Sequence, residues 1–197
     1  MDTIEYYYTP ISPWTYFGHQ RLAEIAKRHG ARIAMKPCDV GRVFAATGGL
    51  PLPKRPPARL AYRLVELRRW REVLGIELNL QPAHFPVDPT AASLAIIAAL
   101  AIDGEQAGHD FAGRLMRAVW AEERNIADEA TIAAIATEAG LDAERILEGR
   151  AAAVPTYERN TEAALAIGMF GAPWYRLRDE GFWGQDRLDL LDRALGH

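Results

Sequence analysis

The chain has 197 residues, nearly half of them hydrophobic and a quarter charged, so it can bury a substantial core and is neither disordered nor fibrous. Its formal net charge of -3 supplies no overall basic field, which argues against nucleic acid or an anionic membrane as a partner. A small, weakly charged or anionic ligand remains open.

The location of the protein follows from three features. The N-terminal residues MDTIEYYY do not form a basic segment followed by an apolar one, so no signal peptide is expected. The most apolar segment, residues 91–102, is too short to cross a bilayer. The single cysteine, Cys38, rules out an internal disulfide. The sequence therefore predicts a cytoplasmic protein.

The first forty residues predict a strand, a helix and a second strand. Residues 4–9 are rich in aromatic and β-favouring side chains and stop at Pro10. A helix opens at Ser12-Pro13 and ends at Gly30 after three basic residues. Residues 31–36 read as the second strand, which completes a βαβ unit.

A long helical block follows a loop rich in glycine and proline at residues 47–57. Asp88-Pro89 is expected to open an alanine-rich helix, and residues 109–123 continue the helical periodicity. Asp142 is expected to cap a short helix, and Pro155 to start the last helix of the block.

The C-terminal residues return to strand patterns. Residues 172–178 and 181–183 predict a strand pair, and residues 186–195 a closing helix. The two ends of the chain are expected to share one sheet, because their strands cannot otherwise be buried. The sequence thus predicts an α/β domain made of residues 1–41 and 169–197, interrupted by a helical insertion of residues 42–168.

Ser12 is the first candidate functional residue. A serine before proline at a helix start is a common N-cap, and local sequence favours that interpretation. A hydroxyl beside unpaired N–H groups at the positive end of a helix also suits an anion. Both interpretations require the same geometry, so neither excludes the other.

Two C-terminal motifs are further candidates. In Gly171-Ala172-Pro173 the proline is expected to mark a strand start, although a cis peptide would expose the backbone of Ala172 to a ligand. At Gly184-Gln185-Asp186, either side chain can cap the closing helix, or the same helix terminus and carboxylate can hold a charged ligand group.

A basic cluster follows the proline-rich loop. Most such runs are solvated helix faces, but an arginine in the first turns, Arg59 above all, could clamp a carboxylate. The cluster consists of Lys54, Arg55, Arg59, Arg63, Arg68, Arg69 and Arg71.

Several chemistries are not supported. The five histidines show no paired spacing for a metal, and the chain has no Walker loop, dinucleotide fingerprint or Gly-x-Ser-x-Gly elbow. Cys38 follows a proline at the end of a strand and is expected to be an inert core thiol.

The order and spacing of these motifs resemble the 2-hydroxychromene-2-carboxylate isomerase family, related to kappa-class glutathione transferases and more distantly to DsbA oxidoreductases. The segments that carry the resemblance span nearly the whole chain and begin at residues 12, 43, 84, 120, 160, 170 and 182, with sequences SPWTY, VFAATG, HFP, WAEERNIAD, NTEA, FGAP and FWGQDRL. The resemblance implies a thioredoxin-like fold with a large all-helical insertion, glutathione as cofactor and a homodimer.

The resemblance also implies roles for individual residues. Ser12 would be catalytic and would hold the glutathione sulfur as a thiolate, which the physics of a hydroxyl at a helix terminus supports. Ala172, preceding Pro173, would pair through its backbone with the cysteinyl part of glutathione. Gly184, Gln185 and Asp186 would bind the γ-glutamyl end.

The implied reaction interconverts a chromene hemiketal carboxylate and a trans-benzylidenepyruvate. Glutathione would add to the conjugated carbon, the ring would open, rotation would follow about the bond made single, and glutathione would leave unchanged. A kappa-like glutathione transferase or peroxidase, and a non-catalytic thioredoxin-fold binding protein, are the alternatives.

Several positions depart from residues that relatives commonly carry, namely Gly49, Arg59, Glu66, Asp88, Ala172 and Trp174. Gly49, Arg59 and Asp88 stand at positions expected to bind substrate. Arginine can still clamp a carboxylate, but Gly49 lacks a side-chain donor and Asp88 adds a possible anion. The resemblance implies a small aromatic carboxylate as substrate, and these departures leave open a substrate different from that of the family.

Overall fold

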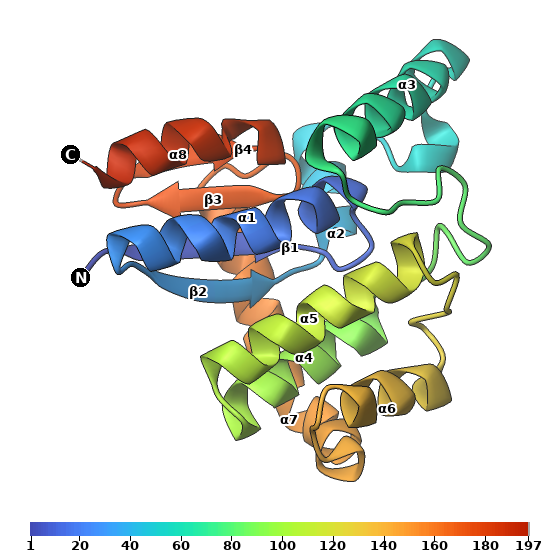
Figure 1. The fold of residues 1–197 in the computed structure, drawn as a ribbon, viewed down its shortest axis with the longest axis vertical. Helices are drawn as coiled ribbons and strands as arrows, with labels where there is room; N and C mark the ends of the chain where they lie inside the picture. Colours follow the sequence, from blue (N-terminus) through green and yellow to red (C-terminus); the bar gives the residue numbers. More distant parts are fainter. Residues whose placement is uncertain (197) are drawn as a thin grey trace.

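The computed structural model describes residues 1–196, and in them both ends of the chain contribute to one mixed sheet (Figure 1). The strands are β1 (Thr3–Tyr8), β2 (Arg32–Pro37), β3 (Trp174–Leu177) and β4 (Glu180–Trp183), in the order β2-β1-β3-β4. β1 lies parallel to β2 and antiparallel to β3. This sheet, with a helix between β1 and β2 and a helical segment inserted before β3, has the predicted thioredoxin-like arrangement.

Helices cover both faces of this sheet. Their bounds are α1 (Pro13–His29), α2 (Val40–Thr47), α3 (Pro57–Leu74), α4 (Thr90–Ile102), α5 (Glu105–Trp120), α6 (Glu129–Glu138), α7 (Ala143–Ala166) and α8 (Leu188–Leu195), with 3-10 turns η1 (Leu52–Lys54) and η2 (Gln185–Arg187). α1 packs against α5 and α8, while α7 packs against α2 and α4. In the described part of the chain, no helix combines the length and apolarity that crossing a membrane requires.

Side chains of β1 alternate between the two faces, as the two-residue period of a strand requires. Tyr6 and Tyr8 belong to the main core with α1, α4, α5 and α8, whereas Tyr7 packs with Cys38 and residues of α2 and α7. All three tyrosines are almost completely buried. β1 is therefore the centre of the sheet and of both hydrophobic clusters.

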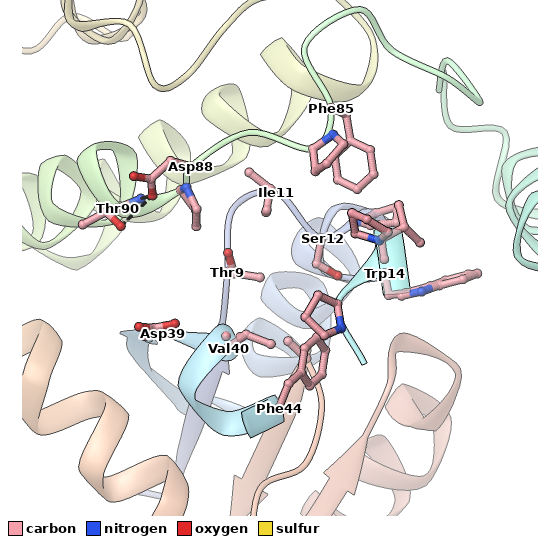
Figure 2. A pocket seen from close by; sticks show the side chains of 18 of the residues that line it. Thr9, Ile11, Ser12, Trp14, Asp39, Val40, Phe44, Phe85, Asp88 and Thr90 are labelled. Carbon is pink, nitrogen blue, oxygen red and sulfur yellow. Dashed lines mark hydrogen bonds between the residues drawn. The ribbon is translucent and has the colours of Figure 1, made fainter. Parts of the chain in front are cut away.

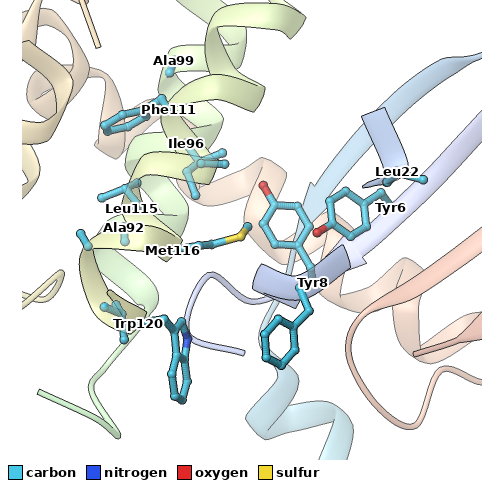
Figure 3. Packing of buried hydrophobic residues seen from close by; sticks show 14 of the residues in the cluster. Tyr6, Tyr8, Leu22, Ala92, Ile96, Ala99, Phe111, Leu115, Met116 and Trp120 are labelled. Atoms are coloured by element: carbon cyan, nitrogen blue, oxygen red, sulfur yellow. The ribbon is translucent and has the colours of Figure 1, made fainter. Parts of the chain in front are cut away.

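One hydrophobic core joins the sheet to the helical block. Figure 3 shows the Met116 thioether of α5 pointing toward Tyr6 and Tyr8, with Ile96 of α4 and Trp120 beside it. All of these side chains are fully buried. The helical block thus shares its core with the strands.

The prediction for the last helix of the block is wrong. Pro155 lies inside α7, which has 24 residues and begins at the Asp142 cap, where the carboxylate accepts the N–H of Arg145 at 3.2 Å. A proline removes one helical hydrogen bond. Packing of α7 against α2, α4 and α6 offsets that loss, since tertiary contacts supply most helix stability.

Two other boundaries differ by a few residues. α4 begins at Thr90 rather than at Pro89, because Asp88 accepts hydrogen bonds from the Thr90 N–H at 2.9 Å and its hydroxyl at 2.7 Å. At the C-terminus neither Gln185 nor Asp186 caps α8 with its side chain. The chain passes through η2 first, so the expected cap at that point is wrong.

His19 of α1 is a buried neutral histidine. Its Nδ1 lies 3.3 Å from the Tyr6 hydroxyl and its Nε2 lies 3.0 Å from the carbonyl of His109, whose ring stacks on it. These partners suit a ring that donates from Nε2 and accepts at Nδ1. Burial, with the neighbouring His109, lowers the pKa of His19 to about 3. Burial also lowers the pKa of His109.

Truncation of Met116 tests the shared core. Met116→Ala should lower the free energy of unfolding by about 2–5 kcal/mol, because it leaves a cavity between α5 and the tyrosines. The exposed Val73→Ala is the control and should change stability by roughly 0.5 kcal/mol or less. Urea unfolding followed by tryptophan fluorescence and by circular dichroism measures both variants. Equal stabilities for the two would contradict this packing.

Acid should destabilise the protein in part through His19. Its folded pKa lies below the unfolded value, so only the unfolded chain takes up this proton as pH falls from about 6.5 toward 3. The free energy of unfolding should therefore fall between pH 7 and pH 5, and His19→Gln should reduce that fall. The same dependence in the variant and the wild type would show that His19 is not buried as a neutral ring.

Candidate functional site

Ser12 stands at the N-terminus of α1, where the chain leaves β1. Its backbone is extended, its Oγ accepts the N–H of Thr15 at 3.2 Å, and Pro13 occupies the first helical position. The predicted N-cap is confirmed. The first turn of α1 contains no acidic side chain, so the positive end of the helix dipole is not neutralised within the turn.

A cavity of about 440 Å³ opens beside Ser12, and we call it the main cavity. Figure 2 shows Ser12 between Phe44 of α2 and Phe85 of the loop before α4, with Trp14 to one side. Ala172 from the other end of the chain also lines it. The aromatic side chains next to the Ser12 hydroxyl suit an organic ligand more than a hydrated ion.

A second cavity of about 290 Å³ borders the first. It is lined by Gly184, Gln185 and Asp186, and it shares Trp14 and Ala172 with the main cavity. The pairing of β1 with β3 brings these C-terminal residues beside α1. Residues predicted to bind the two parts of one ligand therefore lie in adjoining cavities.

A third cavity, of about 590 Å³, is lined by two of the three residues predicted to bind substrate, Gly49 and Arg59. Trp14 borders it as well, so all three cavities meet at this side chain. Asp88, the remaining predicted substrate residue, lines the main cavity. Pro173 is buried and lines none of the three.

The Gly171-Ala172-Pro173 motif has both features considered for it, a strand start and a cis peptide bond. β3 begins immediately after Pro173, and the Ala172-Pro173 peptide bond is cis. Residue pairing between β1 and β3 starts at Trp174, so the backbone of Ala172 lies outside the ladder. The Pro173 carbonyl accepts the N–H of Gly184 at 2.9 Å, which holds the turn at Gly184 beside the start of β3.

Two polar side chains of the second cavity are already engaged. Gln185 is 1% exposed, and its Oε1 accepts from Arg21 at 2.5 Å. Asp186 is exposed and pairs with Arg187 at 2.6 Å. Gly184 has a φ of 94°, and a Cβ there would meet the Asp186 carboxylate at 2.5 Å. Asp186 is therefore an exposed carboxylate at this cavity, beside its partner Arg187, whereas Gln185 supports the turn.

The third cavity explains why glycine occupies position 49. A Cβ at Gly49 would lie 2.4 Å from the ring of Phe44, so the aromatic side chain fills the space that a larger residue would need. One oxygen of the Asp88 carboxylate, Oδ1, accepts both hydrogen bonds from Thr90. The departure at 49 thus has a local structural reason, whereas these bonds do not distinguish aspartate from asparagine at 88.

Sequence reasoning named Arg63 only as one member of the basic cluster. In the structure Arg63 lines the main and third cavities and is half-buried, whereas Arg59 is exposed and lines only the third. Residues four apart share a helix face, so the position of Arg63 one turn after Arg59 was the available signal.

The described residues contain no group of three or more His, Cys, Asp or Glu side chains placed to hold a metal. Cys38 is fully buried, and burial raises the pKa of its thiol to about 12. A thiol in this state is a poor nucleophile. Cys38 therefore belongs to the core, as predicted.

Comparisons with known proteins agree with this architecture. The DSBA-like thioredoxin domain family matches residues 3–196. The chain is 30% identical to the 2-hydroxychromene-2-carboxylate isomerase of Pseudomonas putida, over 98% of this chain and 94% of that protein. A solved 2-hydroxychromene-2-carboxylate isomerase superposes with a TM-score of 0.83 at 29% identity, covering 98% and 94% of the two chains. Human glutathione S-transferase kappa 1 is 24% identical over 98% of this chain and 91% of its own.

The mixed sheet, with a helix that begins directly after its central strand, defines a thioredoxin-fold protein of the DsbA type. Within that class, the chain belongs to the family of 2-hydroxychromene-2-carboxylate isomerases, to which the kappa-class glutathione transferases are also related.

Removal of the Ser12 hydroxyl should first cost a helix cap. Ser12→Ala is expected to lower the free energy of unfolding by about 1 kcal/mol, whereas Ser12→Asn should keep the cap and most of the stability. Chemical denaturation of the three proteins measures this. A much larger loss in Ser12→Asn than in Ser12→Ala would show that the cavity tolerates no larger side chain at this cap.

Proposed function

We propose that the protein is a glutathione-dependent isomerase that interconverts 2-hydroxychromene-2-carboxylate and trans-o-hydroxybenzylidenepyruvate, or acts on a similar aromatic carboxylate. The observation that carries this proposal is the Ser12 hydroxyl, which caps α1 and also lines the main cavity. The names of the relatives in the preceding comparison support the same reaction class.

The residues around Ser12 fit a thiol-bearing peptide. The Ser12 hydroxyl hydrogen is free to donate, because Oγ takes part only as an acceptor in the hydrogen bonds of the described residues. Donation to sulfur, with the unneutralised helix terminus, stabilises a thiolate and lowers the thiol pKa from about 8.5 toward neutrality. Bound glutathione would supply a nucleophile able to add reversibly to a conjugated carbon, so that a double bond becomes a single bond free to rotate.

Residues of the adjoining cavity would hold the rest of the tripeptide. The backbone of Ala172 lies outside the strand ladder and beside both cavities, so it can pair with an extended peptide. Asp186 offers an exposed carboxylate to the ammonium of the γ-glutamyl end, with Gly184 next to it. Gln185 would act through the turn and through Arg21 rather than by side-chain contact.

The walls of the main cavity would receive the aromatic substrate. Phe44, Phe85 and Trp14 present flat apolar surfaces around Ser12. Such surfaces exclude water from a thiolate and a conjugated acid, which strengthens the electrostatic effect of the hydroxyl. The protein would therefore orient the substrate over the sulfur without moving electrons to or from a redox group.

A kappa-like glutathione transferase is the second candidate, because human glutathione S-transferase kappa 1 is similar over nearly the whole chain. Both activities would use the same thiolate. They differ in what becomes of it, since an isomerase returns free glutathione and a transferase consumes it.

Turnover with thiol accounting separates these functions. Purified protein should convert 2-hydroxychromene-2-carboxylate only when glutathione is present, with no net loss of thiol. Ser12→Ala and Ser12→Asn should both lose most of the activity, whereas Ser12→Thr should retain part of it, because only threonine keeps a hydroxyl at the cap.

The outcomes are distinct for each alternative. Consumption of thiol with a generic electrophile would select the transferase. Full activity in Ser12→Ala would reduce Ser12 to a cap. Failure to bind glutathione at millimolar concentration would contradict both enzymatic functions and leave a non-catalytic binding protein.

A further inference from the structure

Arg63 of α3 is a half-buried cation without an anionic partner among the described residues. Its Nη2 is inaccessible to solvent and makes no hydrogen bond to the described residues, and the charged group that acts on the guanidinium is another cation, Arg55. The guanidinium carbon lies 5.2 Å from the ring centroid of Phe85 and 5.8 Å from that of Trp120. Aromatic faces hold an arginine in place but do not neutralise it.

A second cation reinforces this charge. Arg55 lies 5.9 Å from the Phe44 ring, donates from Nε to the Leu50 carbonyl at 2.8 Å and lines the main cavity with Arg63. Burial, together with the positive charge of Arg55, lowers the pKa of Arg63 to about 10. Both side chains remain charged near neutral pH, so the cavity contains positive charge that the described residues do not balance locally.

The carboxylates of the main cavity lie elsewhere and are engaged. Asp39 caps α2 by accepting the N–H of Arg42 at 3.1 Å, and Asp88 is bound to Thr90. Figure 2 shows both aspartates on the side of the cavity away from Phe85, the ring that Arg63 covers. The main cavity therefore has an acidic end and a cationic, aromatic end.

We propose that Arg63, supported by Arg55, is the anion site of the main cavity and receives the carboxylate of a flat conjugated acid whose body lies against Phe85. Taking this acid to be the substrate rests on the proposed isomerase function, but the anion site itself does not. The guanidinium nitrogens other than the enclosed Nη2 can donate charge-assisted hydrogen bonds to a carboxylate. The acidic end would repel the same group, so the acid would bind in one orientation.

Arg63 suits this role better than Arg59, the residue that the sequence favoured. Arg59 is exposed, and an exposed arginine is screened by water and salt. At Arg63 a bound carboxylate would compensate a charge that is already partly removed from water, and charge-assisted hydrogen bonds are the strong ones. The free energy gained when a carboxylate pairs with the arginine is therefore larger at Arg63, inside the cavity, than at the exposed Arg59.

Equilibrium binding of trans-cinnamate tests this site without requiring turnover. Quenching of tryptophan fluorescence, or calorimetry, should show that Arg63→Met weakens cinnamate binding by roughly 10- to 100-fold, the loss expected for charge-assisted hydrogen bonds. Arg63→Lys should lose less. The matched control is Arg68→Met, an exposed arginine of the same helix, which should bind as the wild type does. Cinnamamide, which has no charge, should bind the wild type and Arg63→Met equally.

Methionine keeps an apolar stem against Phe85 and Trp120, so Arg63→Met should fold, and its unfolding midpoint verifies this. If Arg63→Met does not fold, the cinnamate affinity of Arg63→Lys tests the site independently. The proposal would be overturned if Arg63→Met kept the cinnamate affinity of the wild type, or if the wild type did not bind cinnamate. It would also be overturned if Arg59→Met lost more cinnamate affinity than Arg63→Met.

Glutathione is the other source of carboxylates, and a parallel titration separates the two. Arg63→Met should leave glutathione affinity near that of the wild type, and cinnamate should bind in the presence of glutathione. If Arg63→Met lost affinity for glutathione but kept its affinity for cinnamate, the proposal would be overturned. If cinnamate binds through Arg63 while no glutathione-dependent turnover is found, the anion site stands and the proposed isomerase function fails.

Discussion

The backbone pairing of β1 with strands from both ends of the chain is the constraint on which the rest of the structure depends. β1 is hydrogen-bonded to β2 on one side and to β3, about 170 residues later, on the other. This pairing delivers Ser12 at the C-terminal end of β1 and places Ala172 and the turn at Gly184 beside it. The tyrosines of β1 fill both faces of the sheet, so loss of the pairing would remove the core and separate the cavities together.

Local signals predicted the elements that depend on local chemistry. Pro13 after Ser12, the cap at Asp142 and the stop at Gly30 were readable because each satisfies orphan backbone groups within a few residues. Pro155 misled because tertiary packing along α7 outweighs one missing hydrogen bond, which no local pattern reveals. The residue patterns predicted an interrupted α/β domain, the family resemblance implied the thioredoxin-like fold, and the family match confirms it.

The site was less accessible to sequence reasoning than the fold. The predicted residues fall into three adjoining cavities, and whether they act there stays a prediction. The position of Arg63 one turn after Arg59 was too weak a signal to choose it, because what distinguishes Arg63 is its packing against Phe85 and Trp120, two rings distant in sequence. Likewise, glycine at position 49 reads as a lost donor in the sequence but as room for Phe44 in the structure. Such facts arise only from long-range packing.

The central claim is that the Ser12 hydroxyl and the N-terminus of α1 together hold the sulfur of glutathione as a thiolate. The most direct test is a pH titration of thiolate absorbance for glutathione bound to the protein, compared between the wild type and Ser12→Ala. The account predicts a thiol pKa well below about 8.5 in the wild type and a return toward that value in the variant. A bound thiol that titrates near 8.5 in the wild type, or a depressed value that survives the loss of the hydroxyl unchanged, would contradict it.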